Sequence, residues 1–407
     1  MIIRLDQMIK VTSSALDIVE GELLGVKRDH GKRIACLAAA AGRRLNMPEE
    51  TLRSLSVCAL FHDSALTEYI LAHEDGAKES DKRLHCEYGQ RNADNLLGEG
   101  AAPGFVLYHH ERADGKGLFG KKAGEFPQAA EIISACDLID LQSLLSDPAE
   151  KPGIIAFIKE CSGTVFTEPV CSALLSAIDG GCLELLTDGK LDETTDALFP
   201  EWPVEADRSI VFRFAALISY IIDCKSPFTK RHSQQIANKA WLMGGFYNYE
   251  RDERALLYLA AAFHDIGKLG TPNSILDKPG ALTPEEFKII QAHSALTEEL
   301  LSRVDGFEKI TLWACSHHEK LNGKGYHNGL TEERMDFNSR LLACLDIYQA
   351  VSEERPYHPA RAHEDTMPIL YDMAKKGLID ADISRGLDEA LAEYSLRDVP
   401  PPERTTE

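Results

Sequence analysis

The residues best suited to chemistry are histidines and aspartates that recur in one order in both halves of the chain. The second-half set consists of His232, His264, Asp265, His293, His317, His318 and Asp346. The first-half set consists of His30, His62, Asp63, His85, His109, His110 and Asp137. Seven polar residues repeated in the same order indicate a tandem duplication.

The spacing within the two sets is nearly the same. The first two histidines are 32 residues apart in each half, and the third and fourth are 24 residues apart. The final aspartate follows the His-His pair by 27 residues in the first half and by 28 in the second. Only the step from the His-Asp pair to the next histidine differs, at 23 and 29 residues. The longer step contains the Gly/Pro-rich run "KLGTPNSILDKPGAL".

Imidazole nitrogens and carboxylate oxygens together are typical ligands of divalent transition metals. Five imidazoles and two carboxylates are too many for one ion and suit two, with an aspartate beside a histidine able to bridge them. A metal pair lowers the pKa of a bridging water and holds phosphoryl oxygens, which suits phosphoester hydrolysis. A single helical histidine is more often a packed or hydrogen-bonded residue, so the prediction depends on the whole repeated set.

The segments that carry these residues have helical periodicity. Apolar residues recur at three- and four-residue spacing over 209–223, 254–263, 284–304 and 340–351. Thr283 followed by Pro284 and two glutamates is typical of a helix start. The sequence therefore predicts an all-α protein. Proline and acidic residues interrupt the pattern near 198–209, which predicts a regulatory domain over 1–200 and a catalytic domain over 201–400.

Composition limits the partners. The 407 residues are 44% hydrophobic and 27% charged, as in globular proteins, and the formal net charge of −21 argues against binding to duplex DNA. The most apolar segment, 209–223, is too short for a membrane span and contains Arg213. The chain opens without a secretory signal, and its ten cysteines form no close CxxC pair. We expect a cytoplasmic protein without a membrane partner.

The second half also resembles a known family. The order HD…H…HHE…GxGY…D, followed by "LDIYQAVSEERPYHPA", is similar to the HD-GYP phosphodiesterases of bacteria. Residues 209–395 resemble the family along their length, and residues 15–180 resemble it as a second, degenerate copy. The resemblance implies two tandem HD-type helical bundles and hydrolysis of cyclic dinucleotides with iron or manganese ions.

The resemblance also implies roles for individual residues. One metal ion would be held by His232, His264, Asp265 and Asp346. The other would be held by Asp265, His293, His317 and His318, so that Asp265 bridges the two. Lys268 matches a lysine that contacts the scissile phosphate and assists the leaving oxygen. Substrate-contacting positions are matched by Tyr326, Gln349 and Arg355.

Three positions depart from the family pattern. His327 replaces the proline of the signature, which affects loop rigidity and partner recognition more than metal binding. Gln349 stands where the family usually has an aspartate, so the base preference is open. Phe228 stands where members with three metals place a glutamate, which favours two ions.

The first half keeps all seven candidate ligands but loses other groups. Leu66 replaces the lysine, and "GKGLFG" replaces the Gly-Tyr-Pro loop. A site with ligands but without phosphate-positioning groups should turn over substrate slowly or not at all. Whether this half binds metal stays open, and regulation of the second half is its expected use.

The predicted reaction is attack of a metal-bridging hydroxide on a cyclic dinucleotide, with Lys268 neutralising the developing charge. The substrate is cyclic di-GMP or 3′,3′-cGAMP, and the product is the linear dinucleotide. Two alternatives stay open: a broader HD-type nucleotide phosphohydrolase, and a non-catalytic scaffold that binds a cyclic dinucleotide. A diguanylate cyclase partner and a homodimer are also left open.

Overall fold

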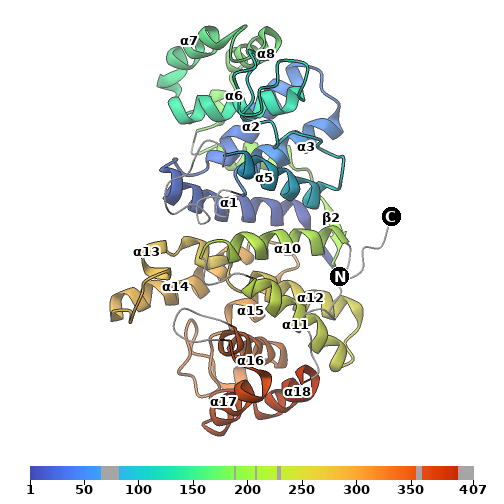
Figure 1. Ribbon diagram of the computed structural model, residues 1–407, viewed down its shortest axis with the longest axis vertical. Helices are drawn as coiled ribbons and strands as arrows, with labels where there is room; N and C mark the ends of the chain where they lie inside the picture. Colours follow the sequence, from blue (N-terminus) through green and yellow to red (C-terminus); the bar gives the residue numbers. More distant parts are fainter. Residues whose placement is uncertain (66–81, 188, 207–208, 227–230, 354–359, 393–407) are drawn as a thin grey trace. The chain divides into compact units, whose positions relative to one another are not determined.

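The computed structural model describes residues 1–65, 82–187, 189–206, 209–226, 231–353 and 360–392 (Figure 1). Apart from one two-stranded sheet, the regular secondary structure of the described residues is helical, which confirms the all-α prediction. It forms two compact units. The amino-terminal unit is Thr12–Trp202, and the carboxy-terminal unit combines Met1–Val11 with Pro203–Glu407. The regulatory and catalytic roles of the predicted domains stay predictions. Among the described residues, every helix is too short or too polar to cross a bilayer.

The carboxy-terminal unit is a helical bundle. Its main helices are α10 (Ser209–Asp223), α11 (His232–Phe246), α12 (Arg251–Phe263), α14 (Pro284–Leu301), α15 (Glu308–Cys315), α16 (Phe337–Ser352), α17 (His363–Lys375) and α18 (Ala381–Leu391). Shorter turns are η3 (Ile266–Gly270), α13 (Asn273–Leu276) and η4 (Glu332–Arg334). Helix α12 packs against α10, α11 and α15, so its run of apolar residues is buried at the centre of the bundle.

The start of α14 follows the sequence prediction. The Thr283 hydroxyl accepts a hydrogen bond from the Glu286 backbone N–H, and the Glu286 carboxylate accepts one from the Thr283 N–H. This reciprocal capping box, with Pro284 in the first turn, fixes where the helix begins. The same helix carries a candidate ligand in its third turn.

The chain's first residues contribute a small sheet that the sequence patterns did not predict. Strand β1 (Ile2–Arg4) pairs antiparallel with β2 (Pro203–Glu205), with Ile3 opposite Val204. Helix α1 (Leu5–Leu24) follows β1 and continues into the amino-terminal unit. Strands of three residues are too short to show an alternating pattern, which explains the omission.

The amino-terminal unit is also a helical bundle. Besides the rest of α1, it contains α2 (His30–Arg44), α3 (Glu49–Leu60), α5 (Lys82–Leu97), α6 (Gln128–Gln142), α7 (Lys151–Cys161), α8 (Glu168–Asp179) and α9 (Leu191–Leu198), with short turns η1 (Pro148–Glu150) and η2 (Leu183–Leu185). Helix α2 is central and packs against α3, α6, α8 and α9.

Candidate metal centre

The carboxy-terminal unit brings all seven predicted ligands into one cluster. His232 begins α11, His264 and Asp265 follow α12, His293 lies in α14, His317 and His318 follow α15, and Asp346 lies in α16. All are buried except His318, which is half-buried. The cluster therefore lies where several helices of the bundle converge.

One donor set contains His232, His264 and Asp346. Their candidate ligand atoms all lie within 4.8 Å of one another. The Asp346 Oδ1 atom is 3.3 Å from His232 Nε2 and 4.0 Å from His264 Nε2. Donor atoms that each lie about 2 Å from a shared ion are themselves about 3 to 4 Å apart. The set therefore has the dimensions of a metal site.

A second donor set contains His293, His317 and His318, again within 4.8 Å of one another. The Asp265 carboxylate lies between the two sets. Its Oδ2 atom is 3.1 Å from His264 Nε2, and its Oδ1 atom is 3.5 Å from His293 Nε2 and 3.6 Å from His317 Nε2. This placement suits a carboxylate that bridges two ions.

Hydrogen bonds orient the imidazole rings. The Nδ1 atoms of His264, His293 and His317 lie 2.7, 2.6 and 2.5 Å from the carbonyl oxygen three residues earlier. His232 Nδ1 lies 2.9 Å from a carboxylate oxygen of Glu353. Because Nδ1 donates to these acceptors, the Nε2 lone pair faces the cluster and is available to a metal.

The electrostatics keep the acidic ligands ionised. Burial alone would raise the pKa of Asp265, but nearby His264 holds that pKa well below its ordinary value. The pKa of Asp346 is likewise held low, by its contact with His232. Burial lowers the pKa of His293 to about 3, so its ring is neutral at physiological pH. Burial would lower the pKa of His232, but its contacts with Asp346 and Glu353 raise it to about 9, so this imidazole must lose a proton to coordinate a metal.

The turn after α12 places Lys268 at this cluster. The Lys268 Nζ atom is 2.5 Å from Asp265 Oδ2, and the side chain remains 19% exposed. Residue 267 must be glycine, because a Cβ atom there would lie 2.0 Å from the carbonyl oxygen of His293. The close approach of η3 to α14 thus brings an accessible cation to the edge of the donor sets.

The segment after His318 is held by the glutamate of the "HHE" run. The Glu319 carboxylate accepts hydrogen bonds from the backbone N–H groups of Asn328 and Leu330, at 2.6 and 3.0 Å. Gly325 approaches the Glu319 backbone so closely that a Cβ atom would lie 2.4 Å from Glu319 Cα. Glu319 therefore shapes the loop that carries Tyr326.

Tyr326 lies beside the second donor set. Its ring centroid is 4.7 Å from that of His318 and 6.3 Å from that of His293. The next residue, His327, stands in place of the signature proline, and its Nε2 atom lies 2.5 Å from a Glu298 carboxylate oxygen on α14. This hydrogen bond tethers the loop at the residue that replaces the signature proline.

Gln349, another predicted substrate contact, lies in the protein interior. Gln349 is 1% exposed, and its amide is bonded to Lys239, Gln235 and Glu353. Its predicted contact with substrate stays a prediction, and its observed contacts lie within the protein. Arg355 and Phe228 are outside the described residues.

The amino-terminal unit assembles its seven residues in a comparable way. His30 Nε2 is 3.3 Å from Asp137 Oδ1, and His62 Nε2 is 3.8 Å from the same atom. Asp63 Oδ1 is 3.0 Å from His85 Nε2. The rings of His109 and His110 lie beside that of His85, at centroid distances of 5.2 and 5.8 Å. Leu66, which replaces the lysine, is outside the described residues.

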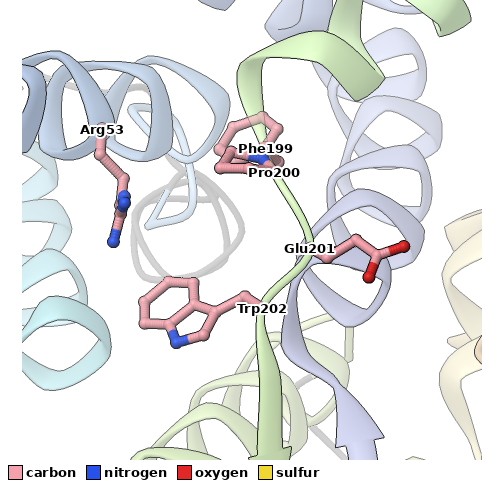
Figure 2. A pocket seen from close by; sticks show the side chains of 5 residues that line it. All are labelled: Arg53, Phe199, Pro200, Glu201 and Trp202. Carbon is pink, nitrogen blue, oxygen red and sulfur yellow. The ribbon is translucent and has the colours of Figure 1, made fainter.

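The amino-terminal unit also has a pocket whose lining residues belong to neither cluster. Figure 2 shows its lining side chains, Arg53, Phe199, Pro200, Glu201 and Trp202. The Arg53 guanidinium carbon lies 5.6 Å from the centroid of the Trp202 ring, at the distance of a cation–π contact. No candidate metal ligand lines this pocket.

Sequence reasoning missed the residues that support the ligands. Glu353 orients His232 from 121 residues away in the sequence, and that separation gives no local signal. Glu319 did have a signal, because a glutamate follows the His-His pair in both halves. In the amino-terminal unit, Glu111 likewise accepts hydrogen bonds from the backbone N–H groups of Phe119 and Lys121.

Comparisons with known proteins agree with this architecture. The sequence family described as "HD domain" matches residues 216–383. A 3′3′-cGAMP-specific phosphodiesterase 1 of Vibrio cholerae is 26% identical over 372 residues, which cover 87% of this chain and 85% of that protein. The 3′3′-cGAMP-specific phosphodiesterase 3 of that species is 37% identical over 171 residues, covering 42% of this chain and 37% of the relative.

Two further similarities widen the comparison. A cyclic di-GMP phosphodiesterase of Thermotoga maritima is 28% identical over 191 residues, which cover 46% of this chain and 50% of that protein. The crystal structure of a cyclic GMP-AMP-specific phosphodiesterase of V. cholerae, V-cGAP3, superposes with a TM-score of 0.66 at 22% identity. It covers 97% of this chain and 99% of the other, which shows a shared fold.

Proposed function

We propose that the carboxy-terminal unit, whose residues 216–383 match the HD-domain family, hydrolyses a cyclic dinucleotide to the linear dinucleotide. The family match and the relatives named as cyclic dinucleotide phosphodiesterases agree with the resemblance predicted from the sequence. A degenerate second copy in the amino-terminal unit stays a prediction. The observation that carries the proposal is the convergence of two His/Asp donor sets with Asp265 between them and Lys268 at their edge.

Two divalent ions, iron or manganese, fit the two donor sets. The sets offer imidazole nitrogens and carboxylate oxygens, which these metals accept. When bound, such ions lower the pKa of water and hold phosphoryl oxygens. Asp265 would bind both ions, since its two oxygens face different sets. The number and identity of the ions are part of the proposal.

The chain's own residues would position the diester. Lys268 would exchange its contact with Asp265 for the phosphate and donate an N–H to the leaving oxygen, because its ammonium group is accessible at the cluster edge. The Tyr326 ring would stack on a base, because it lies next to His318 on a half-buried loop. Both contacts hold the substrate across the two donor sets.

We favour 3′,3′-cGAMP over cyclic di-GMP as the substrate. The relative that matches along most of this chain is named for 3′3′-cGAMP, whereas the cyclic di-GMP phosphodiesterase of T. maritima matches about half of it. The proposed compartment is the cytoplasm. All ten cysteines are free thiols, as expected in a reducing compartment.

The test uses purified full-length protein loaded with manganese or iron(II) and incubated with 3′,3′-cGAMP, cyclic di-GMP or a mononucleotide. We expect linear dinucleotide to form, fastest from 3′,3′-cGAMP. Faster turnover of the mononucleotide would favour a broader phosphohydrolase. Unchanged substrate in every reaction, with metal bound, would contradict the enzymatic proposal.

A further inference from the structure

The amino-terminal cluster contains a thiol that the carboxy-terminal cluster lacks. Cys86 follows His85 on α5, whereas Ser294 follows His293 at the matching position on α14. The ligand atoms of His85, Cys86, His109 and His110 all lie within 4.8 Å of one another. The amino-terminal cluster therefore offers one sulfur and three nitrogen donors.

The surroundings of this group are those of a binding site. Cys86, His85 and His109 are 0, 4 and 0% exposed. His109 Nδ1 donates to the Val106 carbonyl oxygen at 2.5 Å, which leaves its Nε2 without a proton. That Nε2 lone pair lies 3.4 Å from His85 Nε2. The Asp63 Oδ1 atom lies 3.0 Å from His85 Nε2 and 3.9 Å from His109 Nε2, so a carboxylate beside these nitrogens favours a cation there.

The neighbouring donor set also indicates a cation site. His30, His62 and Asp137 form a second group with ligand atoms within 4.8 Å of one another. Among the described residues, His62 Nε2 and the Oε2 atom of Glu20 are buried and make no hydrogen bond. Glu20 is 1% exposed, and its titratable neighbours include the carboxylates of Asp17 and Asp63 as well as His62. Buried carboxylates are rarely left without a cation or a hydrogen-bond donor.

We propose that the amino-terminal unit holds a metal ion of its own, bound by the Cys86 thiolate with His85, His109 and His110. Thiolate sulfur and imidazole nitrogen are both donors that tetrahedral zinc takes in proteins. Binding replaces the thiol proton, which is released to solvent, so no oxidant or reductant takes part. The site prefers Zn²⁺, whereas the sulfur-free carboxy-terminal sets suit iron or manganese. It ties α5 to the segment that carries the His-His pair.

The test uses Co²⁺ as a spectroscopic probe for zinc in the full-length protein, after the native metals are removed with a chelator. The wild type should show thiolate-to-cobalt charge-transfer absorption in the near ultraviolet. Cys86→Ser should lose this absorption and bind one Zn²⁺ fewer per chain. Cys171→Ser, which removes another buried thiol of the same unit, should change neither.

Loss of the proposed site can be distinguished from misfolding of a variant. Serine is compatible with this position, because Ser294 occupies its counterpart, and far-ultraviolet circular dichroism will verify the fold of each variant. A second variant, His110→Ala, should also lower the Zn²⁺ content. No charge-transfer absorption in the wild type, or absorption and zinc content that persist in Cys86→Ser, would overturn the proposal. Neither result bears on hydrolysis by the carboxy-terminal unit, so the two proposals are tested separately.

Discussion

The two units place the same seven residue types in similar clusters but surround them with different groups. In the carboxy-terminal unit, Lys268 contacts the central aspartate, whereas Leu66 stands at a corresponding place in the amino-terminal sequence. Tyr326 lies beside the His-His pair, whereas Leu118 follows the corresponding glycine of the first half. The proposed metal ligands and the proposed phosphate contacts can therefore be tested separately.

The clusters also differ in the carboxylate that contacts Nδ1 of the first histidine. His30 Nδ1 lies 2.7 Å from Asp140, and Arg33 binds that same carboxylate. His232 Nδ1 lies near Glu353 instead, while Gln349 takes the place that Asp140 has in the first half. Each unit thus gives its histidine a carboxylate partner from a different sequence position, and only the three-dimensional arrangement reveals the equivalence.

The largest expected difference in turnover is between variants of the two central aspartates, Asp265 and Asp63. Asp265→Asn should lower turnover of the cyclic dinucleotide by about 1,000-fold or more, because this carboxylate would hold the proposed metal ions, which lower the barrier by several kcal/mol. Asp63→Asn should leave turnover within about threefold of wild type, because Asp63 belongs to the amino-terminal cluster. A threefold change corresponds to under 1 kcal/mol. Initial rates at saturating metal measure both. Equal losses in the two variants would contradict the division of roles.

The next effect concerns the lysine that only one unit has. Lys268→Met should lower kcat by about 100- to 1,000-fold, as expected when one charged donor to the leaving group is lost. Metal content measured by elemental analysis should stay at the wild-type value. A variant that loses metal together with activity would show that Lys268 supports the ligands rather than the phosphate.

A smaller effect is expected from the carboxylate behind His232. Glu353→Gln should weaken metal binding in the carboxy-terminal unit by about 10- to 100-fold, the usual cost of losing a group that orients a ligand. Titration of turnover with added manganese measures this as a shift of the half-maximal concentration. Asp140→Asn is the matched variant of the other unit and should leave that titration unchanged.

The last prediction tests whether residues 86 and 294 occupy equivalent positions in the two clusters. Ser294→Cys, introduced together with Cys86→Ser, should restore thiolate-to-cobalt absorption, now from the carboxy-terminal unit. The Ser294 hydroxyl lies 3.3 Å from His293 Nε2, so a sulfur there reaches the donor set. A double variant with cobalt bound but without this absorption would show that the two positions are not equivalent.

Much of the cluster could be predicted because its information lies in repeated spacing. Two histidines 32 residues apart in both halves, and two others 24 apart, predicted side chains that gather in each unit. The start of α14 was also predictable, since Thr283 and Glu286 form a local capping box. Ligands and caps depend on residue type and short-range geometry, which the sequence displays directly.

The features that escaped prediction depend on long-range contacts. The pairing of β1 with β2 joins residues about two hundred positions apart through three-residue strands. Glu353 reaches His232 across the bundle, and Gln349 turns out to bond within the protein. Cys86 carried no signal as a donor, because a lone cysteine in a helix is usually a packed thiol.

The central claim is that the carboxy-terminal unit holds two divalent ions, one at each donor set, joined by Asp265. Anomalous diffraction from crystals of the manganese-loaded full-length protein tests this most directly. The account predicts two anomalous peaks in that unit, one among His232, His264 and Asp346 and the other among His293, His317 and His318, with the Asp265 carboxylate between them. A fully loaded crystal in which those side chains surround no peak, or a single peak that Asp265 does not contact, would contradict the account.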